Sequence, residues 1–337
     1  MLKSLKFGKL LGRAGLAGAL ALSVATLASA ADMRLKFAGT FPVDHPGTKM
    51  MEQIKADIEA ADVGLKVSLF PANQLGSGEA LMEDTIRGNI DFTAAFIYSH
   101  KDPRLEFLSM PFLVNNFDEM DSIMRNMDSP FNQILQERLN ELGLRLLANN
   151  PEGFTGIVAN KKPENWNVMG SKDMNIRVWS SPVVKNMVEG LGFQATTMAW
   201  GDIFPALQSG IVDGAICCTK SATYSIFAQS DVGKYYVQYN SVSELTSYYA
   251  SEKTWAKLSE EQRAAVQTAF TKASDDFFAY NRENDAKFGE LLQEKGYEIL
   301  ALNDEEQAAM AAWVRENIWP TMVDTIGQDT LDRLTAE

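Results

Sequence analysis

The residue with the clearest potential for chemistry is an arginine inside an otherwise apolar strand pattern. Arg177 lies in Asn175-Ile176-Arg177-Val178-Trp179, which leads through Ser180-Ser181-Pro182 into a helical pattern. Burial of a guanidinium without a partner is costly, so Arg177 must pair with an acidic residue of this chain or face a cleft. Its planar fork of N–H donors suits the carboxylate or sulfonate group of a ligand. From the residues alone the two alternatives carry equal weight.

The other reactive side chains are few. With two His and two Cys in the chain, a conventional zinc site is improbable. His45 and His100 fall in predicted loops and belong to no recognisable triad. Cys217 and Cys218 are adjacent and could form a vicinal disulfide in an oxidising compartment, but that ring is strained, so we favour two small buried thiols. Motifs of serine hydrolases, zinc proteases and nucleotide-binding loops are absent. We therefore expect no catalytic residue, no metal and no cofactor.

The composition is that of a globular protein with an acidic surface. The chain has 337 residues, of which 46% are apolar, and 31 Lys+Arg against 44 Asp+Glu give a net charge of -13. The length suffices for about two domains. A strongly negative protein is poorly suited to binding nucleic acid or anionic lipid, because both require clusters of cationic side chains.

The first thirty residues have the pattern of a cleaved secretory signal. An apolar run over 14–27 precedes the small residues Ala28-Ser29-Ala30. Four cations stand before or at the start of that run: Lys3, Lys6, Lys9 and Arg13. The alternative is a membrane anchor, but the run is short for a bilayer and lacks a charged stop. We predict export of a mature protein that is not embedded in a membrane.

The remaining pattern alternates strands and helices. Strands are expected at 33–38, 65–70 and 91–97, with helices at 48–61 and 79–87 between them, which favours a parallel sheet. A helix over 117–142 and strands at 144–148, 155–160, 175–179 and 212–217 follow, with helices at 183–191 and 202–209. From Ser259 to Lys295 one helix of roughly 55 Å is expected to brace two lobes. The alternative is two helices broken near Gly289.

Several short motifs occur in an order that resembles a known family. They are Phe70-Pro71-Ala72-Asn73-Gln74-Leu75-Gly76, Arg87-Gly88-Asn89-Ile90-Asp91, Met110-Pro111-Phe112-Leu113, the Arg177 strand, and Ala206-Leu207-Gln208-Ser209-Gly210-Ile211-Val212-Asp213-Gly214. Across the whole mature chain they resemble the solute-binding proteins of tripartite ATP-independent periplasmic (TRAP) transporters, of the dicarboxylate-binding-protein type.

The resemblance implies an α/β, two-lobed periplasmic binding protein fold of type II-like architecture, hinged, with a ligand cleft between the lobes. Lobe I would comprise 31–152 with about 243–282, and lobe II 153–242 with about 283–337. The resemblance also implies that Arg177 clamps an acid group of the ligand. The protein would act as a monomer in the periplasm and deliver its ligand to the small and large membrane subunits of a TRAP permease.

The departures from the family pattern concern the ligand. Cys217 stands where many members have an Asn that helps to hold the carboxylate, and Phe154 or Thr155 stands where sialate-binding members have a second arginine. Aromatic side chains are expected to replace this polarity, although each is equally compatible with a core or hinge position. Besides Arg177, the candidate ligand-binding residues are Gln74, Glu79, Phe96, Tyr98, Phe154, Trp179, Trp200, Cys217 and Tyr224. For Glu79 a helix N-terminal charge is the better interpretation, and for Lys220 a solvated cation.

The expected ligand is a small organic acid. Loss of one Arg and one Asn contact favours a monoanion with an apolar or aromatic body, such as an aromatic acid, a 2-oxo acid or a sulfonate. A C4-dicarboxylate or a sugar acid in the same role remains an alternative, as does a receptor used for sensing. A secreted enzyme is the least favoured hypothesis, because Cys217 is the only candidate nucleophile and lacks an evident His partner.

Overall fold

The computed structural model describes residues 32–336, so the predicted signal segment lies outside the described residues. Sheet A contains five strands in the order β2-β1-β3-β10-β4. Its strands are β1 (Met33–Gly39), β2 (Leu65–Phe70), β3 (Phe92–Ala95), β4 (Leu144–Phe154) and β10 (Ser243–Ser251). β1 is parallel to β2 and β3, as the sequence predicted, but β10 is antiparallel to both β3 and β4.

Sheet B contains six strands in the order β11-β9-β5-β8-β6-β7. They are β5 (Gly156–Ala159), β6 (Asn175–Val178), β7 (Gln194–Thr197), β8 (Gly214–Cys218), β9 (Tyr235–Gln238) and β11 (Glu298–Ala301). The chain passes between the sheets three times: where β4 leads into β5, where β9 leads into β10, and from β10 through two helices to β11. The predicted mixed α/β class with two sheets is confirmed, whereas the residue boundaries of the lobes stay a prediction.

Most helices flank the two sheets. Those between the strands of sheet A are α1 (Pro46–Ala60), α2 (Gly78–Arg87), the 3-10 helix η1 (Pro103–Ser109), α3 (Phe117–Glu119), a π-helical turn (Met120–Arg125) and α4 (Pro130–Glu141). Those that follow are α5 (Pro182–Gly190), the 3-10 turn Trp200–Asp202, α6 (Ile203–Ser209), α7 (Lys220–Ile226) and α8 (Glu252–Trp255). The predicted continuous helix over 117–142 is wrong. Ser129 caps a new helix whose first residue is Pro130, and a proline at that position cannot continue a preceding helix.

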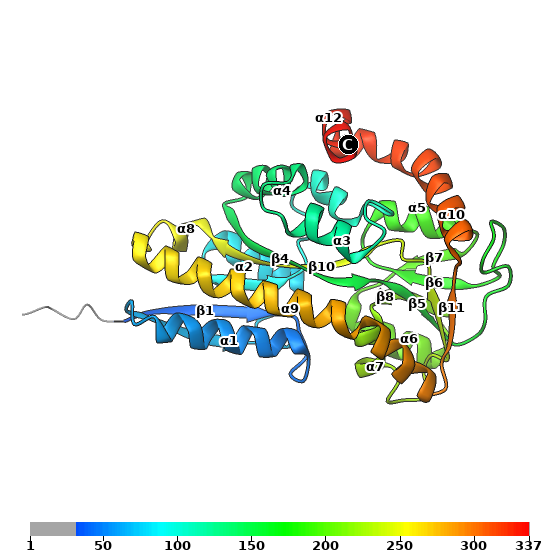
Figure 1. Ribbon diagram of the computed structural model, residues 1–337, viewed down its shortest axis with the longest axis horizontal. Helices are drawn as coiled ribbons and strands as arrows, with labels where there is room; N and C mark the ends of the chain where they lie inside the picture. The colour runs from blue at the N-terminus through cyan, green and yellow to red at the C-terminus, as the bar shows by residue number, and fades with distance from the viewer. Residues whose placement is uncertain (1–31, 337) are drawn as a thin grey trace, which may run out of the picture. The chain divides into compact units, whose positions relative to one another are not determined.

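One long helix spans both sheets. α9 (Glu260–Glu294) runs unbroken for 35 residues, so the alternative of a break at Gly289 is wrong. The predicted capping box of Ser259 and Gln262 begins it. Its first half packs Phe270 against the Phe37 and Tyr248 rings of sheet A, at 5.3 Å between centroids in each case. Its second half buries Leu292 in the core beside sheet B. Figure 1 shows α9 crossing the face of the molecule from α1 to α7.

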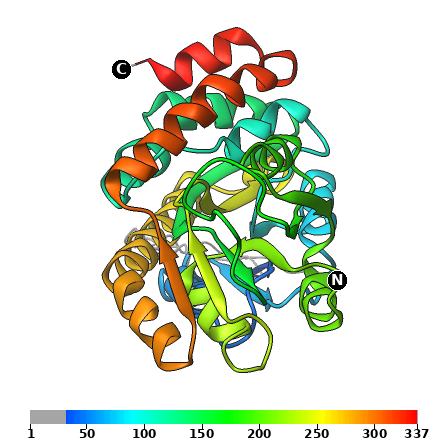
Figure 2. The ribbon, with the colours of Figure 1, turned by 90° about the vertical axis from the view of Figure 1, so that its right-hand side faces the viewer.

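The C-terminal segment leaves sheet B after β11 and returns over the sheet A side. It comprises α10 (Asp304–Asn317), the 3-10 turn Trp319–Met322, α11 (Val323–Ile326) and α12 (Gln328–Thr335). α11 packs on η1 and α12 on α4, and Arg333 binds Glu137 of α4 at 3.0 Å. Figure 2 shows these helices together at one end of the molecule. The segment therefore ties parts of the chain that lie almost 200 residues apart.

The predicted strand at 144–148 is longer in the structure. β4 continues to Phe154 and includes Pro151, because β10 pairs along nearly all of it. The register of this pair shifts between Ser243 and Leu245, which marks a β-bulge. β-bulges bend a strand and re-aim its side chains, and they often occur next to functional sites.

Candidate functional site

A cavity of about 740 Å³ lies against residues of both sheets. Its wall includes the loop after β3, the N-terminus of α2, the ends of β6 and β8, and the facing stretch of β4 and β10. A volume of several hundred Å³ is typical of a pocket for a small molecule. Among the described residues, its lining contains one arginine and four glutamates: Arg177, Glu79, Glu106, Glu152 and Glu244.

Arg177 is buried in the cavity wall without an acidic partner. Its Nε donates to the Met198 carbonyl oxygen at 2.9 Å, and one terminal nitrogen donates to the Ile216 carbonyl oxygen at 3.4 Å. No ion pair joins it to any acidic residue of the described chain. Burial lowers the pKa of the Arg177 guanidinium to about 10, while Tyr98 and Glu79 act in the opposite direction, so the group stays charged at neutral pH. The alternative of an internal salt bridge therefore finds no support, and several N–H groups are left for a ligand.

Tyr98 and Glu79 stand near Arg177. Burial raises the pKa of the Tyr98 hydroxyl, the charge of Glu79 raises it further and Arg177 lowers it, so Tyr98 stays protonated and can donate a hydrogen bond. A Cβ at Gly78 would lie 2.7 Å from Tyr98 Cε2, closer than real Cβ contacts. The glycine therefore allows the ring to pack against the start of α2.

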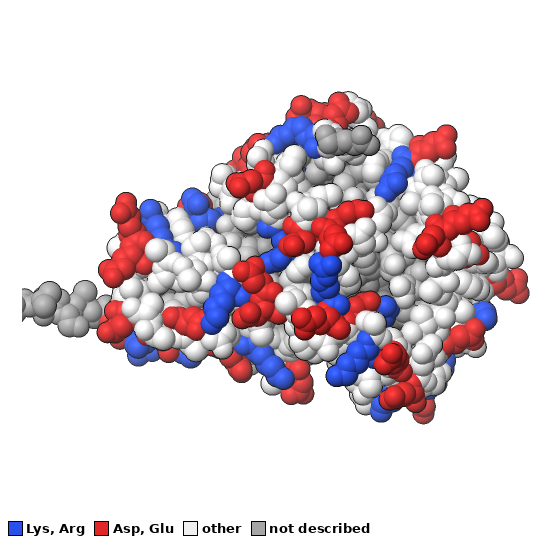
Figure 3. Space-filling view, in the orientation of Figure 1, with Lys and Arg blue, Asp and Glu red and all other residues white. Residues whose placement is uncertain are grey.

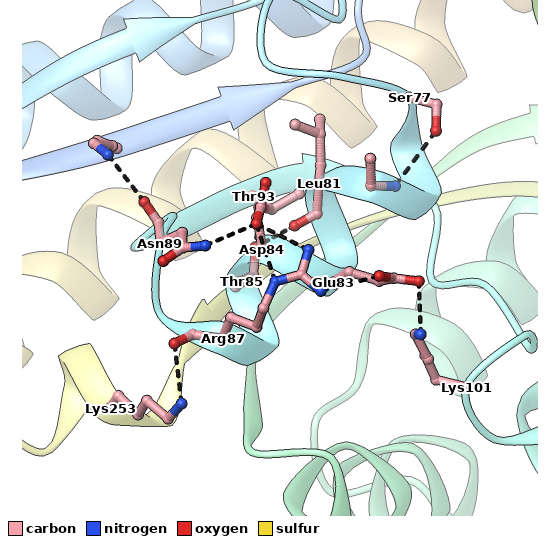
Figure 4. Close-up of polar contacts among 12 residues, drawn as sticks. Ser77, Leu81, Glu83, Asp84, Thr85, Arg87, Asn89, Thr93, Lys101 and Lys253 are labelled. Carbon is pink, nitrogen blue, oxygen red and sulfur yellow. Dashed lines mark hydrogen bonds and ion pairs between the residues drawn. The ribbon is translucent and has the colours of Figure 1, made fainter.

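A network of surface contacts holds α2 in place. Ser77 caps its N-terminus and Gly88, at φ 80, ends it. Arg87 binds Glu83 at 3.1 Å and Asp84 at 3.0 Å, and Lys101 binds Glu83 at 2.6 Å (Figure 4). The Lys253 ammonium donates to the Arg87 carbonyl oxygen at 3.0 Å, which links α2 to α8 (Figure 4). Lys101 and Lys253 thus connect the second half of α2 to neighbouring segments, and Ser77 caps the end that carries Glu79.

Four of the predicted aromatic residues line the cavity. Phe96 and Tyr98 follow β3, with ring centroids 6.4 Å apart, and Trp179 follows β6. Trp200 is 43% exposed and Phe96 is 36% exposed, so both present open ring faces. Their part in ligand binding stays a prediction.

Three predicted residues do not line the cavity. Gln74 is exposed, because left-handed backbone at Ala72 and Asn73 turns the loop so that Asn73 faces the cavity instead. Phe154 packs edge-on against Phe117 in the core. Tyr224 lies 5.9 Å from the Phe288 ring of α9.

Two expectations about residues near α7 are wrong. Lys220 is not solvated: its ammonium binds Asp285 at 2.7 Å and its side chain is 12% exposed. The structure joins Cys217 and Cys218 by a disulfide, so the preference for two thiols is wrong. The strain of the ring had argued against it, but both residues are buried in consecutive positions at the end of β8. Cys217 lines the cavity.

Glu106 lines the cavity as a well-satisfied carboxylate. It accepts hydrogen bonds from the Ser181 hydroxyl, from the Val183 amide at 3.1 Å and from the Ser99 hydroxyl at 3.0 Å. Burial raises the pKa of Glu106, and these three donors oppose the rise. The carboxylate caps the start of α5, and this structural role accounts for an acidic side chain at that position without a ligand.

Glu152 and Glu244 form a second, less satisfied acidic group that sequence reasoning missed. Glu152 accepts from the Thr246 hydroxyl at 2.9 Å, and Glu244 accepts from the Thr219 amide at 2.9 Å. Burial raises the pKa of both, Glu244 raises that of Glu152 further, and the pKa of Glu244 reaches about 7. The signal for them was weak, because one charged residue near the end of a strand pattern is common and neither glutamate belongs to a motif.

His45 stands beside this pair. Its Nε2 is 3.7 Å from a Glu152 oxygen, and its ring stacks on Phe41 at 4.9 Å. The Gly47 amide donates to Nδ1 at 3.1 Å, so the neutral ring carries its proton on Nε2. Burial lowers the pKa of His45 to about 4, so the ring is neutral at pH 7.

Residues 32–336 contain no cluster of three or more His, Cys, Asp or Glu that could hold a metal ion. Over the same range no helix is long and apolar enough to cross a membrane. On the face shown in Figure 3, acidic and basic side chains are interspersed over α9 and its neighbours.

Two sheets joined by direct strand connections thus form the walls of a cavity that contains a buried arginine. Residues 37–323 match the model of the bacterial extracellular solute-binding proteins, family 7, also called DctP. The chain belongs to that family and has its two-lobed fold. It is a periplasmic solute-binding receptor of the TRAP type.

Individual relatives are similar at low identity. The sialic acid-binding periplasmic protein SiaP of Vibrio cholerae is 24% identical over 76% of this chain and 78% of its own length. The ectoine-binding periplasmic protein TeaA of Halomonas elongata is 25% identical over 80% of each chain. The crystal structure of a TRAP periplasmic solute-binding protein from Ochrobactrum anthropi, with its C-terminus bound in the ligand-binding pocket, has a TM-score of 0.79 and 27% identity, covering 91% of this chain and 94% of that one.

Proposed function

We propose that this receptor captures a small organic acid in the periplasm, with Arg177 binding the acid group, and delivers it to the small and large membrane subunits of a TRAP permease. A cleaved signal over residues 1–30 would carry it there, and it would act as a monomer. The observation that carries the proposal is the Arg177 guanidinium, which is buried in the cavity wall and bonded only to backbone carbonyl groups of the described chain.

The physical argument is one of desolvation. A buried guanidinium that has lost water gains strongly from a bidentate carboxylate or sulfonate, because charge-assisted hydrogen bonds strengthen in a medium of low dielectric constant. Tyr98 adds a neutral hydroxyl donor nearby. The two groups together would hold the two oxygens of one acid group.

The rest of the lining limits the ligand. The aromatic faces of Phe96, Trp179 and Trp200 suit a flat or apolar body. A C4-dicarboxylate finds less support, because Lys220 is paired with Asp285 and Arg177 is the one Lys or Arg among the described lining residues. The relatives named above bind sialic acid and ectoine, so the family accommodates acids of different shape. A sugar acid remains an alternative, since its hydroxyl groups would suit the glutamates.

The test is binding of organic acids to the mature protein and to two arginine variants. A thermal-shift panel of aromatic acids, 2-oxo acids, sulfonates, sugar acids and dicarboxylates finds the ligand, because a ligand of the folded state raises Tm. Calorimetry then compares wild type, Arg177→Ala and the control Arg145→Ala, whose arginine pairs with Glu252 outside the cavity. We expect the cavity variant to lose at least about 100-fold in affinity. Equal affinities of all three proteins would refute the clamp.

Delivery and sensing are separated by a second experiment. Transport of the identified acid by cells or vesicles that carry the cognate permease should require this receptor. Normal uptake without it, together with ligand-dependent binding to a signalling protein, would instead support the sensory role.

A further inference from the structure

We infer that the ligand is a zwitterion, whose acid group binds Arg177 while a protonated amine or amidinium group binds the Glu152–Glu244 carboxylate pair. The inference rests on the proposed function and extends it, because it names the second charged group of the ligand. The sequence had favoured an acid whose remaining part is uncharged, and the inference adds a cationic group to that part.

The carboxylate pair is held close by the backbone. Glu152 lies on β4 and Glu244 on β10, and the pairing register of the two strands brackets them: Ser243 pairs with Phe154 and Leu245 with Pro151. The bulge between those pairs places two like charges across from each other, an arrangement that destabilises a sheet unless something compensates it. Both residues are less than 9% exposed and both line the cavity.

The pair has unused hydrogen-bonding capacity. An ionised carboxylate has about four acceptor positions. Glu106, which has a structural role, accepts three hydrogen bonds, whereas Glu152 and Glu244 accept one each among the described residues. Ser243, next to Glu244, also lines the cavity, and its buried hydroxyl has no partner in the described chain. A ligand N–H group would supply the missing donors.

No cation of the described chain neutralises the pair. Lys220 follows the same strand end as Thr219 but binds Asp285 instead. His45 is the basic group within ion-pair distance of Glu152, and its ring is neutral at pH 7. Arg177 donates to the Met198 and Ile216 carbonyl oxygens and forms no ion pair with either glutamate in the described chain. A cationic ligand group would therefore meet an uncompensated acidic site.

The spacing of the two sites sets the size of the ligand. Arg177 donates to Ile216, and Glu244 accepts from Thr219, three residues further along the same segment of chain. At the rise of a strand this separates the two anchor points by about 10 Å. The acid site and the carboxylate pair are therefore separate points of the cavity. A ligand that reaches both has several atoms between its acid group and its cation, as in an ω-amino acid or an aromatic amino acid with its amine opposite the acid group.

Binding of the cation should also depend on pH. The titratable and charged groups around the pair are His45 before α1, Asp285 on α9, Lys220 on α7, Tyr236 on β9 and Tyr248 on β10. The tyrosines stay protonated, because burial raises the pKa of each hydroxyl. The raised pKa of Glu244, about 7, means that the empty site holds a proton below neutrality which a cation must displace. Affinity for a zwitterion should therefore rise between about pH 6 and pH 8, with release of a proton.

The experiment compares matched ligands on matched variants. One ligand set is 5-aminopentanoate, pentanoate and glutarate, and a rigid set is 4-(aminomethyl)benzoate, 4-methylbenzoate and terephthalate. Each set keeps one acid group and changes the opposite end from cation to neutral to anion. Affinities are measured by calorimetry at pH 6 and pH 8 for wild type, Glu152→Gln, Glu244→Gln and the exposed control Glu164→Gln.

We expect wild type to prefer the zwitterion over its neutral partner by at least about tenfold, and the anion to bind weakest. Both cavity variants should lose most of that preference and its pH dependence, while Glu164→Gln keeps them. Equal binding of zwitterion and neutral acid, or stronger binding of the dianion, would overturn the inference and leave the organic-acid receptor standing. Failure of both zwitterions to bind, while an acid from the thermal-shift panel binds and depends on Arg177, would likewise overturn the inference alone. The variant Arg177→Ala is measured alongside, and acid binding that is insensitive to it would contradict the proposed function itself.

Discussion

Replacing Glu244 by Gln should stabilise the empty receptor by an amount that grows from about pH 4.5 to about pH 7 and is constant above it. Burial raises the pKa of Glu244 from 4.5 to about 7. A carboxyl group with a raised native pKa contributes stability below its unfolded pKa and loses it as the pH rises through the native value. Because each pKa unit corresponds to about 1.4 kcal/mol, wild type should lose on the order of a few kcal/mol between about pH 4.5 and pH 7. Glutamine keeps an oxygen for the Thr219 amide and has no charge to desolvate.

The assay is urea unfolding of the ligand-free protein at several pH values. At pH 8 the free energy of unfolding of Glu244→Gln should exceed that of wild type by about 2–3 kcal/mol, and at pH 4.5 the two should nearly coincide. The exposed control Glu164→Gln should follow wild type throughout. A difference that is the same at both pH values would refute the reasoning, because a change in packing alone does not depend on protonation.

Four further outcomes follow from named contacts. Gly78→Ala should weaken acid binding by about tenfold with a normal fold, since the added Cβ displaces the Tyr98 ring; equal affinity in calorimetry would show that Tyr98 does not hold the ligand. Reduction of the Cys217–Cys218 disulfide should add the mass of two hydrogens in mass spectrometry. The variant Cys217→Asn should shift the ligand profile toward more polar acids. An unaltered profile would show that Cys217 is not part of the binding site. Phe270→Ala should lower the free energy of unfolding by about 3–5 kcal/mol, and a loss below 1 kcal/mol would contradict its place in the core.

Local patterns predicted the elements whose signals lie within a few residues. The capping box at Ser259 and the uninterrupted pattern behind it predicted α9 almost to the residue, and Gly88 marked the end of α2 correctly. The helix expected over 117–142 failed because Ser129-Pro130 was read as part of a helix when it is the start of one. The spacing of apolar residues does not show where one helix ends and the next begins, because that depends on the backbone conformation between them.

The cavity depended on contacts that no local pattern contains. Arg177 was identified because a guanidinium in a buried strand is anomalous by itself. Glu152 and Glu244 were missed because each is ordinary alone, and they meet across a strand pair that joins segments 92 residues apart in sequence. The direction in which a loop side chain points is also not evident from the local pattern. Left-handed backbone at Ala72 and Asn73 directs Asn73 toward the cavity and Gln74 toward solvent.

The position of the carboxylate pair gives the ligand a mechanical role as well as a chemical one. β4 leads directly into sheet B and β10 comes directly from it, so the pair lies where two connections between the sheets run side by side. Ionisation of this buried carboxyl pair is costly at that connection in the empty protein, because burial and mutual repulsion both oppose it. A bound cation would remove the same repulsion that Glu244→Gln removes by substitution. Ligand and substitution should therefore stabilise the protein less than additively, because both act on one electrostatic cost.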